Sequence, residues 1–107
     1  MSHLLNDMLL ESLLMNCDGF AVIAFVSSNS IPSDHFRPEF EALSESMRKK
    51  AKFARIDCEE NPSIVDFLKV QATPTTILYK GGEEVARWEG PYSRLALEER
   101  LRKEMKA

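Results

Sequence analysis

The sequence has little cysteine and no strong excess of charge. Its 107 residues include two cysteines, Cys17 and Cys58, whose separation fits neither a disulfide framework nor a metal-ligand spacing. So few cysteines favour a reducing compartment, and we expect a cytoplasmic protein. The net charge of −3 lacks the basic footprint of nucleic-acid binding, so we expect no nucleic-acid partner.

Long apolar runs are also missing. No stretch approaches the roughly 20 apolar residues that a membrane-spanning helix needs, so we expect no membrane partner. The first residues lack the basic start of a signal peptide, and we expect no such leader. A hydrophobic content of 44% and a charged content of 29% are ordinary for one small globular domain, which we expect to span residues 1–107.

What is present is an alternation of helical and extended patterns. Apolar residues recur at helical spacing in residues 4–15, and Gly19 is expected to end this helix with a positive φ. Residues 20–26 form a continuous apolar run, which is typical of a strand buried on both faces of a sheet. Further elements are expected as helices at 34–50 and from Asn61-Pro62, strands at 51–57, 75–79 and 84–88, and a final helix capped by Ser93. This order predicts an α/β fold.

A polar loop around Ser30 and Ser33 joins the buried strand to the following helix. Strand-to-helix turns are where α/β domains usually place their chemistry. Helix capping is the simplest interpretation of both serines, because a serine hydroxyl readily accepts a bond from a first-turn N–H group. A hydrolytic serine would need a base, and His35, two residues along the helix, faces away from Ser33.

A metal site or cofactor has no motif in this sequence. The histidines, His3 and His35, do not combine with the cysteines at a recognisable ligand spacing. Glu59-Glu60 is interpreted as ordinary solvated charge. We therefore expect no metal and no cofactor.

The chain resembles the thioredoxin family from about Asp7 to its C-terminus. An apolar strand ends near Phe25, Pro32 lies between the two serines, and Pro38 lies inside the next helix, where it should kink that helix. The other matching features are Asp57 at a strand end, Asn61-Pro62 opening a helix, Thr73-Pro74-Thr75 before a strand, Gly81-Gly82 and Gly90. The ordered set is far more specific than any one feature.

This resemblance implies a three-layer α/β/α sandwich with a mixed sheet of four or five strands and a cis peptide bond before Pro74. The N-terminal strand is reduced to the few residues around His3 and Leu4, which favours four strands. In the family, backbone groups before the cis-proline pair with an extended protein or peptide segment. The substrate-binding residues that the resemblance implies are Asn29, Ile31, Pro32, Thr73, Pro74 and Gly90.

The sequence departs from the family at its reactive positions. The two catalytic cysteines of the C-x-x-C motif correspond to Ser30 and Ser33, giving an S-x-x-S motif. The tryptophan before the first cysteine corresponds to Asn29, and the buried acid corresponds to Ala24. Disulfide exchange needs a thiolate, whereas a serine hydroxyl stays neutral near pH 7 and forms no disulfide. The chain as written cannot run a dithiol cycle.

Two functional hypotheses follow from this comparison. The first is a redox-inactive member that binds a protein or peptide, and the joint departure at Ala24 and Asn29 favours it. The second is a thiol–disulfide oxidoreductase of cell redox homeostasis whose catalytic cysteines were replaced by serine. Isosteric replacement beside intact Pro32 and Pro74 favours the second. A scaffold that uses its first helix and short edge strand as a contact surface stays open as a third.

Overall fold

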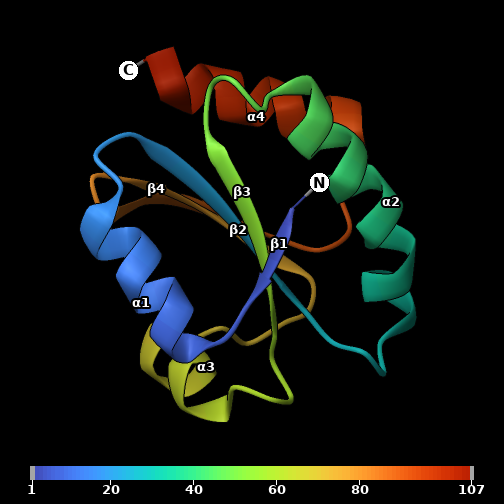
Figure 1. Cartoon of the computed structure of the whole chain (residues 1–107). Coiled ribbons are helices and arrows are strands. Elements are labelled where there is room, and N and C mark those ends of the chain that lie inside the picture. The colour runs from blue at the N-terminus through green and yellow to red at the C-terminus, as the bar shows by residue number, and fades with distance from the viewer. Residues whose placement is uncertain (1, 107) are drawn as a thin grey trace.

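The computed structural model describes residues 2–106, which form five strands and four helices (Figure 1). The elements are, in chain order, β1 (His3–Leu5), α1 (Asp7–Asn16), β2 (Phe20–Val26), α2 (Ile31–Ser46), β3 (Lys52–Asp57), α3 (Pro62–Leu68), β4 (Thr75–Lys80), β5 (Glu83–Glu89) and α4 (Arg94–Lys106).

The strands form one mixed sheet in the order β1-β3-β2-β4-β5. Strand β3 runs parallel to both β1 and β2, whereas β4 is antiparallel to β2 and β5 is antiparallel to β4. The sheet has five strands, the larger of the two expected numbers and not the favoured four, because His3–Leu5 pairs in register with residues 54–56 of β3. Three residues are enough for this strand because the partner already lies in the sheet.

Strand β2 lies at the centre of the sheet, and residues 21–26 of it are buried on both faces. On one face Val22, Ala24 and Val26 pack with residues of α2 and α4. On the other face Ala21, Ile23 and Phe25 pack with residues of α1 and α3. Figure 1 shows the two helix pairs on opposite sides of the sheet. The continuous apolar run therefore forms the middle of an α/β/α sandwich, as the sequence predicts.

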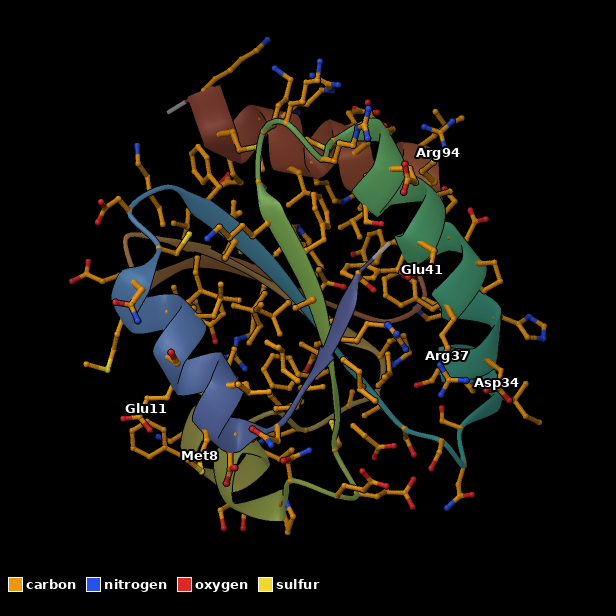
Figure 2. All side chains as sticks on the ribbon, viewed as in Figure 1. Met8, Glu11, Asp34, Arg37, Glu41 and Arg94 are labelled. Atoms are coloured by element: carbon orange, nitrogen blue, oxygen red, sulfur yellow. The ribbon has the colours of Figure 1, made fainter. Side chains whose placement is uncertain are left out.

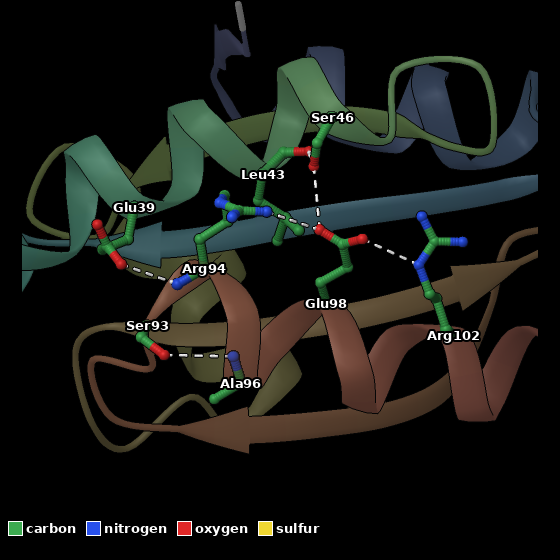
Figure 3. A network of polar contacts seen from close by, with 8 residues as sticks. All are labelled: Glu39, Leu43, Ser46, Ser93, Arg94, Ala96, Glu98 and Arg102. Atoms are coloured by element: carbon green, nitrogen blue, oxygen red, sulfur yellow. Dashed lines mark hydrogen bonds and ion pairs between the residues drawn. The ribbon is translucent and has the colours of Figure 1, made fainter.

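Polar contacts join the two helices of one layer. Glu98 of α4 accepts hydrogen bonds from Ser46 of α2, at 3.2 Å, and from Arg94 and Arg102 of its own helix (Figure 3). Donation by Arg102 is the main cause that lowers the pKa of Glu98 below its ordinary value. At the start of α4, Glu39 of α2 accepts from the backbone N–H of Arg94 at 2.8 Å. These bonds fix α4 against the middle and the end of α2.

Several element ends differ from the sequence predictions. Helix α1 begins at Asp7 and not at residue 4, because Asn6 accepts from the N–H of Leu9 at 2.9 Å and caps it. It ends in extended backbone at Cys17, and positive φ occurs at Gly81, Gly82 and Gly90 and not at Gly19. Helix α2 spans Ile31–Ser46 and not 34–50, because its cap is at residue 30.

Candidate functional site

The loop after β2 lies beside two other loops, at the end of the sheet where β2 and β3 finish and β4 begins. This end is called the edge of the sheet that carries the site. Phe25 pairs with Ile56 of β3 and with Thr75 of β4, so these three strands are in register at this point. The N–H of Cys58 extends the pairing by donating to the carbonyl of Val26 at 2.9 Å. Residues 27–33, 58–61 and 72–74 therefore meet at this edge.

The two serines of the S-x-x-S motif have different roles. Ser30 is the N-cap of α2: its backbone is extended, and its hydroxyl accepts from the N–H of Ser33 at 3.3 Å. Ser33 is fully buried inside the first turn, and its hydroxyl accepts from the N–H of Ser27 at 3.1 Å. The capping prediction is thus confirmed for Ser30 and wrong for Ser33. The Ser33 hydroxyl instead closes the loop, because a third-position side chain points back over the residues that enter the helix.

Glu59 ties the loop to the next β–α connection. Its carboxylate accepts from the hydroxyl of Ser27, from the Asn29 side-chain amide at 2.6 Å and from the Asn29 backbone N–H at 3.3 Å. Donation by Ser27 is the main cause that lowers the pKa of Glu59. Glu59 is exposed, as a solvated charge should be, but the sequence interpretation missed its bonds to the loop. One signal could have found them: Asp57 ends a strand parallel to β2, so Glu59 follows at the same edge.

The predicted substrate-binding residues lie around an exposed apolar tip. The side chain of Ile31 is 72% exposed at the start of α2, and Pro32 beside it is exposed as well. The Thr73–Pro74 peptide bond is cis, and the ring of Pro74 is buried. The carbonyl of Pro74 accepts from the N–H of Gly90 at 2.8 Å, which brings the end of β5 to the start of β4.

The backbone of Thr73 is available to a partner. Its neighbour Thr75 pairs with β2 and β5 on its two sides, and the Thr75 hydroxyl donates to the carbonyl of Ala72 at 2.6 Å. Within residues 2–106, neither the N–H nor the carbonyl of Thr73 forms a hydrogen bond. Thr73 is half-buried, and its unpaired N–H and carbonyl can form backbone hydrogen bonds with an extended segment of a partner.

The position of the family's buried acid holds no titratable group. Ala24 is fully buried between Val22 and Val26 on the face covered by α2 and α4. Its methyl group cannot accept or donate a proton. The hydrolytic alternative has no geometry either, because the buried Ser33 hydroxyl faces the N–H of Ser27 while His35 is exposed.

The described residues contain no cluster of His, Cys, Asp and Glu that could hold a metal ion. The side chain of His3, one of the histidines considered above, lies outside the part of the chain that the structure describes. None of the helices within residues 2–106 is both long and apolar enough to cross a membrane.

Both cysteines are free thiols. Cys17 is buried after α1, with its sulfur 3.7 Å from the carbonyl oxygen of Gly19. Cys58 is half-buried, and its burial, followed by the negative charges of Asp57 and Glu59, raises its pKa to about 11. A thiol with this pKa is almost entirely protonated at neutral pH and is a poor nucleophile.

Alkylation should therefore be slow at Cys58 in the folded chain. At pH 8 a pKa near 11 makes the thiolate about two hundredfold scarcer than in an unfolded chain. The greater nucleophilicity of a high-pKa thiolate recovers about tenfold, which leaves a rate about twentyfold lower. Mass spectrometry of iodoacetamide reactions can measure this in Cys17→Ser, with the urea-unfolded protein as reference. The native rate should keep rising up to pH 11. Equal native and unfolded rates would contradict the environment described for Cys58.

Comparisons with known proteins agree with the fold. The chain matches the family model described as Thioredoxin over residues 2–103. It is 32% identical over 96 residues to chloroplastic Thioredoxin Y1 of Arabidopsis thaliana, covering 90% of this chain and 56% of that protein. The chain thus spans little more than half the length of this relative.

Solved structures match over nearly the whole chain. Chloroplastic thioredoxin z superposes with a TM-score of 0.89 at 22% identity, over 99% of this chain and 96% of its own. Thioredoxin of Fasciola hepatica superposes with a TM-score of 0.85 at 28% identity, over 97% of this chain and 99% of its own. The first of these, at its low identity, establishes the fold alone.

Proposed function

Because the chain belongs to the thioredoxin family, we propose that it binds a protein or peptide segment without exchanging disulfides with it. The binding surface is formed by Asn29, Ile31, Pro32, Thr73, Pro74 and Gly90, and is called the Ser30–Pro74 surface below. The observation that carries the proposal is the exposed Ile31 side chain beside the unpaired backbone of Thr73. A reducing compartment such as the cytoplasm is the proposed setting, supported by two free thiols.

The two features of this surface supply different parts of recognition. The N–H and carbonyl of Thr73 can pair with the backbone of an extended segment, which contributes affinity with little dependence on sequence. Ile31 and Pro32 can contact a side chain of that segment, which contributes specificity. Together they suit a short extended stretch with an apolar residue facing Ile31.

The loop is held before any partner arrives. Glu59 binds both Ser27 and Asn29, and Ser33 binds the N–H of Ser27, so the loop is fixed at both ends. A loop that is already ordered loses less conformational freedom on binding, which leaves more of the contact energy as affinity. These bonds support a binding role that needs no further chemistry.

The absence of dithiol exchange follows from the side chains themselves. Ser30 caps α2 at the point where the family has its attacking cysteine, and Ser33 follows at the resolving position. Neither hydroxyl can form a disulfide. The remaining thiol near this edge, Cys58, has a pKa of about 11 and is not poised to attack.

A second candidate function is that of a thiol–disulfide oxidoreductase whose two cysteines stand replaced by serine. Its support is the intact surroundings of the site: Ser30 at the N-terminus of a 16-residue helix, and a cis bond before Pro74. The relatives named above are thioredoxins, which also supports it. The two candidates share one surface and differ in whether cysteines at positions 30 and 33 would catalyse disulfide exchange.

Peptide selection with a matched substitution tests the binding proposal. A library of extended 12-residue peptides would be selected on the folded chain, and the affinity of the selected peptides measured for Ile31→Asp. We expect at least a tenfold loss, since a charge at the centre of an apolar contact removes a hot spot. Leu95→Asp, at a 68% exposed leucine of α4, is the control and should bind unchanged. If the selected peptides bind Ile31→Asp and the unaltered chain equally, this surface is the wrong one.

A further inference from the structure

A groove of about 760 Å³ lies away from the Ser30–Pro74 surface, between α1, α3 and the turn that joins β4 to β5. Figure 1 shows α1 and α3 side by side on one face of the sheet. The groove shares no lining residue with the Ser30–Pro74 surface. Its function is therefore independent of the function proposed above.

The groove exposes more apolar side chain than a solvated helix surface normally carries. Met8 and Met15 of α1 are 76% and 77% exposed, and Phe67 of α3 is 79% exposed, and all three line it. Helix α1 has apolar side chains at six of its ten positions, yet only Leu10 is buried. Helix α3 has no buried residue. Helices that are apolar on more than one face normally have a second packing partner.

The end of the groove is formed by tightly packed backbone. A side chain at Gly82 would place its Cβ 2.7 Å from the carbonyl oxygen of Leu14, so the turn after β4 lies directly against α1. Gly82 also has a φ of +84°, which disfavours other residues there. The groove is thus a shaped feature of the fold, closed at this end by main chain.

The charged side chains of the groove are all acidic. Asp7, Glu11 and Glu83 line it, and no lysine, arginine or histidine does so among residues 2–106. None of these three carboxylates forms an ion pair within the same residues. Figure 2 shows Met8 and Glu11 projecting from α1 near α3. An apolar floor with unpaired acids at its rim is complementary to a positively charged amphipathic partner.

A helix fits the groove better than an extended segment does. The walls are mainly two helices, and the sheet contributes only the β4–β5 turn and Glu83, the first residue of β5, so the groove offers no length of strand to which another strand could add. Helix α1 has ten residues and is about 15 Å long, which matches about three turns of an occupant helix. Methionine side chains adapt to ligand shape and are frequent where helices dock in grooves.

We propose that this groove binds an amphipathic helix of a partner protein, with apolar side chains against Met8, Met15 and Phe67 and lysine or arginine facing the acidic rim. The contact depends on both halves of the complementarity. Apolar burial supplies affinity, and the carboxylates select a basic helix over an acidic one.

A pair of model helices tests the proposal directly. The probe is an 18-residue fluorescent peptide with leucine at helical i, i+3, i+4 and i+7 positions and lysine elsewhere; its counterpart carries glutamate in place of lysine. We expect the lysine peptide to bind the full chain at low salt and the glutamate peptide to bind at least about tenfold more weakly. Amide chemical-shift changes should fall on α1, α3 and residues 81–83.

Paired substitutions distinguish specific binding in this groove from nonspecific hydrophobic binding of the peptide. Phe67→Ser should weaken the lysine peptide at least tenfold, whereas Leu95→Ser, at a comparably exposed leucine of α4, should not. Glu11→Lys should weaken it as well, and Glu99→Lys on α4 should not. These variants leave the Ser30–Pro74 surface unaltered, so a failure here would not count against the proposed function.

Three results would overturn the proposal. One is no binding of the lysine peptide at concentrations up to about 1 mM. Another is binding that Phe67→Ser does not alter or that maps to the Ser30–Pro74 surface. The last is self-association of the chain in sedimentation that Phe67→Ser abolishes, which would make a second copy the occupant.

Discussion

Replacing Phe40 by alanine is expected to lower the free energy of unfolding by about 3–5 kcal/mol. Phe40 is 1% exposed, and its ring lies 5.7 Å from that of Phe36 on the same helix and 5.8 Å from that of Phe53 on β3. The substitution removes a large apolar group and leaves a cavity that the neighbouring rings can fill only in part. A domain of this size has about 5–15 kcal/mol of stability, so the loss would be severe.

Urea unfolding followed by circular dichroism measures this effect. The midpoint should fall while the slope stays constant, because the surface exposed on unfolding changes little. Phe67→Ala is the matched control: the residue type is the same, the side chain is 79% exposed, and the expected change is below about 0.5 kcal/mol. Equal losses in the two variants would mean that α2 does not pack on β3 as described.

The layers of the fold could be predicted because their signals lie in adjacent residues. The continuous apolar run of β2 requires cover on both faces, and the structure places α1 and α3 on one face and α2 and α4 on the other. The short strand β1 could not be predicted in this way. Its residues Leu4 and Leu5 also fit the helical spacing of α1, and only the presence of β3 beside them decides for a strand.

The position of the site could be predicted, but its internal contacts could not. The capping preference of serine predicted Ser30 as a helix cap, and Ser30 is the cap of α2. It gave no sign that Ser33 would turn to the N–H of Ser27, nor that Glu59 would bind the same loop. These contacts join residues up to 32 positions apart, and side-chain pairing at that separation depends on strand register.

The apolar groove could not be predicted from the sequence either. The sequence shows that α1 carries many apolar side chains, which predicts an amphipathic helix against the sheet. Which of them the sheet covers depends on the rotation of the helix and on the distance to α3. The sheet covers Leu10 and leaves Met8 and Met15 exposed. The exposed apolar face of α1 can therefore be identified only from the structure.

Introducing cysteine at both positions, as Ser30→Cys/Ser33→Cys, is expected to create insulin reductase activity in the presence of dithiothreitol. The N-terminus of α2 would lower the pKa of the thiol at position 30 from about 8.5 toward 7 or below, because the helix dipole stabilises the thiolate. This thiolate would attack an insulin disulfide and release one insulin thiolate. The thiol at position 33, once deprotonated, would displace the second insulin thiolate and close an intrachain disulfide, which dithiothreitol reduces.

The single substitutions are the controls, since one thiol can form the mixed disulfide but cannot resolve it. We expect the double variant to exceed each single variant and the serine chain by at least about tenfold in the rate of insulin precipitation. That result would show that two hydroxyl groups alone stop the reaction here; it is compatible with binding by the serine chain and would keep the oxidoreductase candidate in play. Absence of turnover with a native circular dichroism spectrum would contradict this prediction. The methyl group of Ala24, fully buried where the family has a proton-transferring acid, would then be the next cause to test, and the binding function would be favoured.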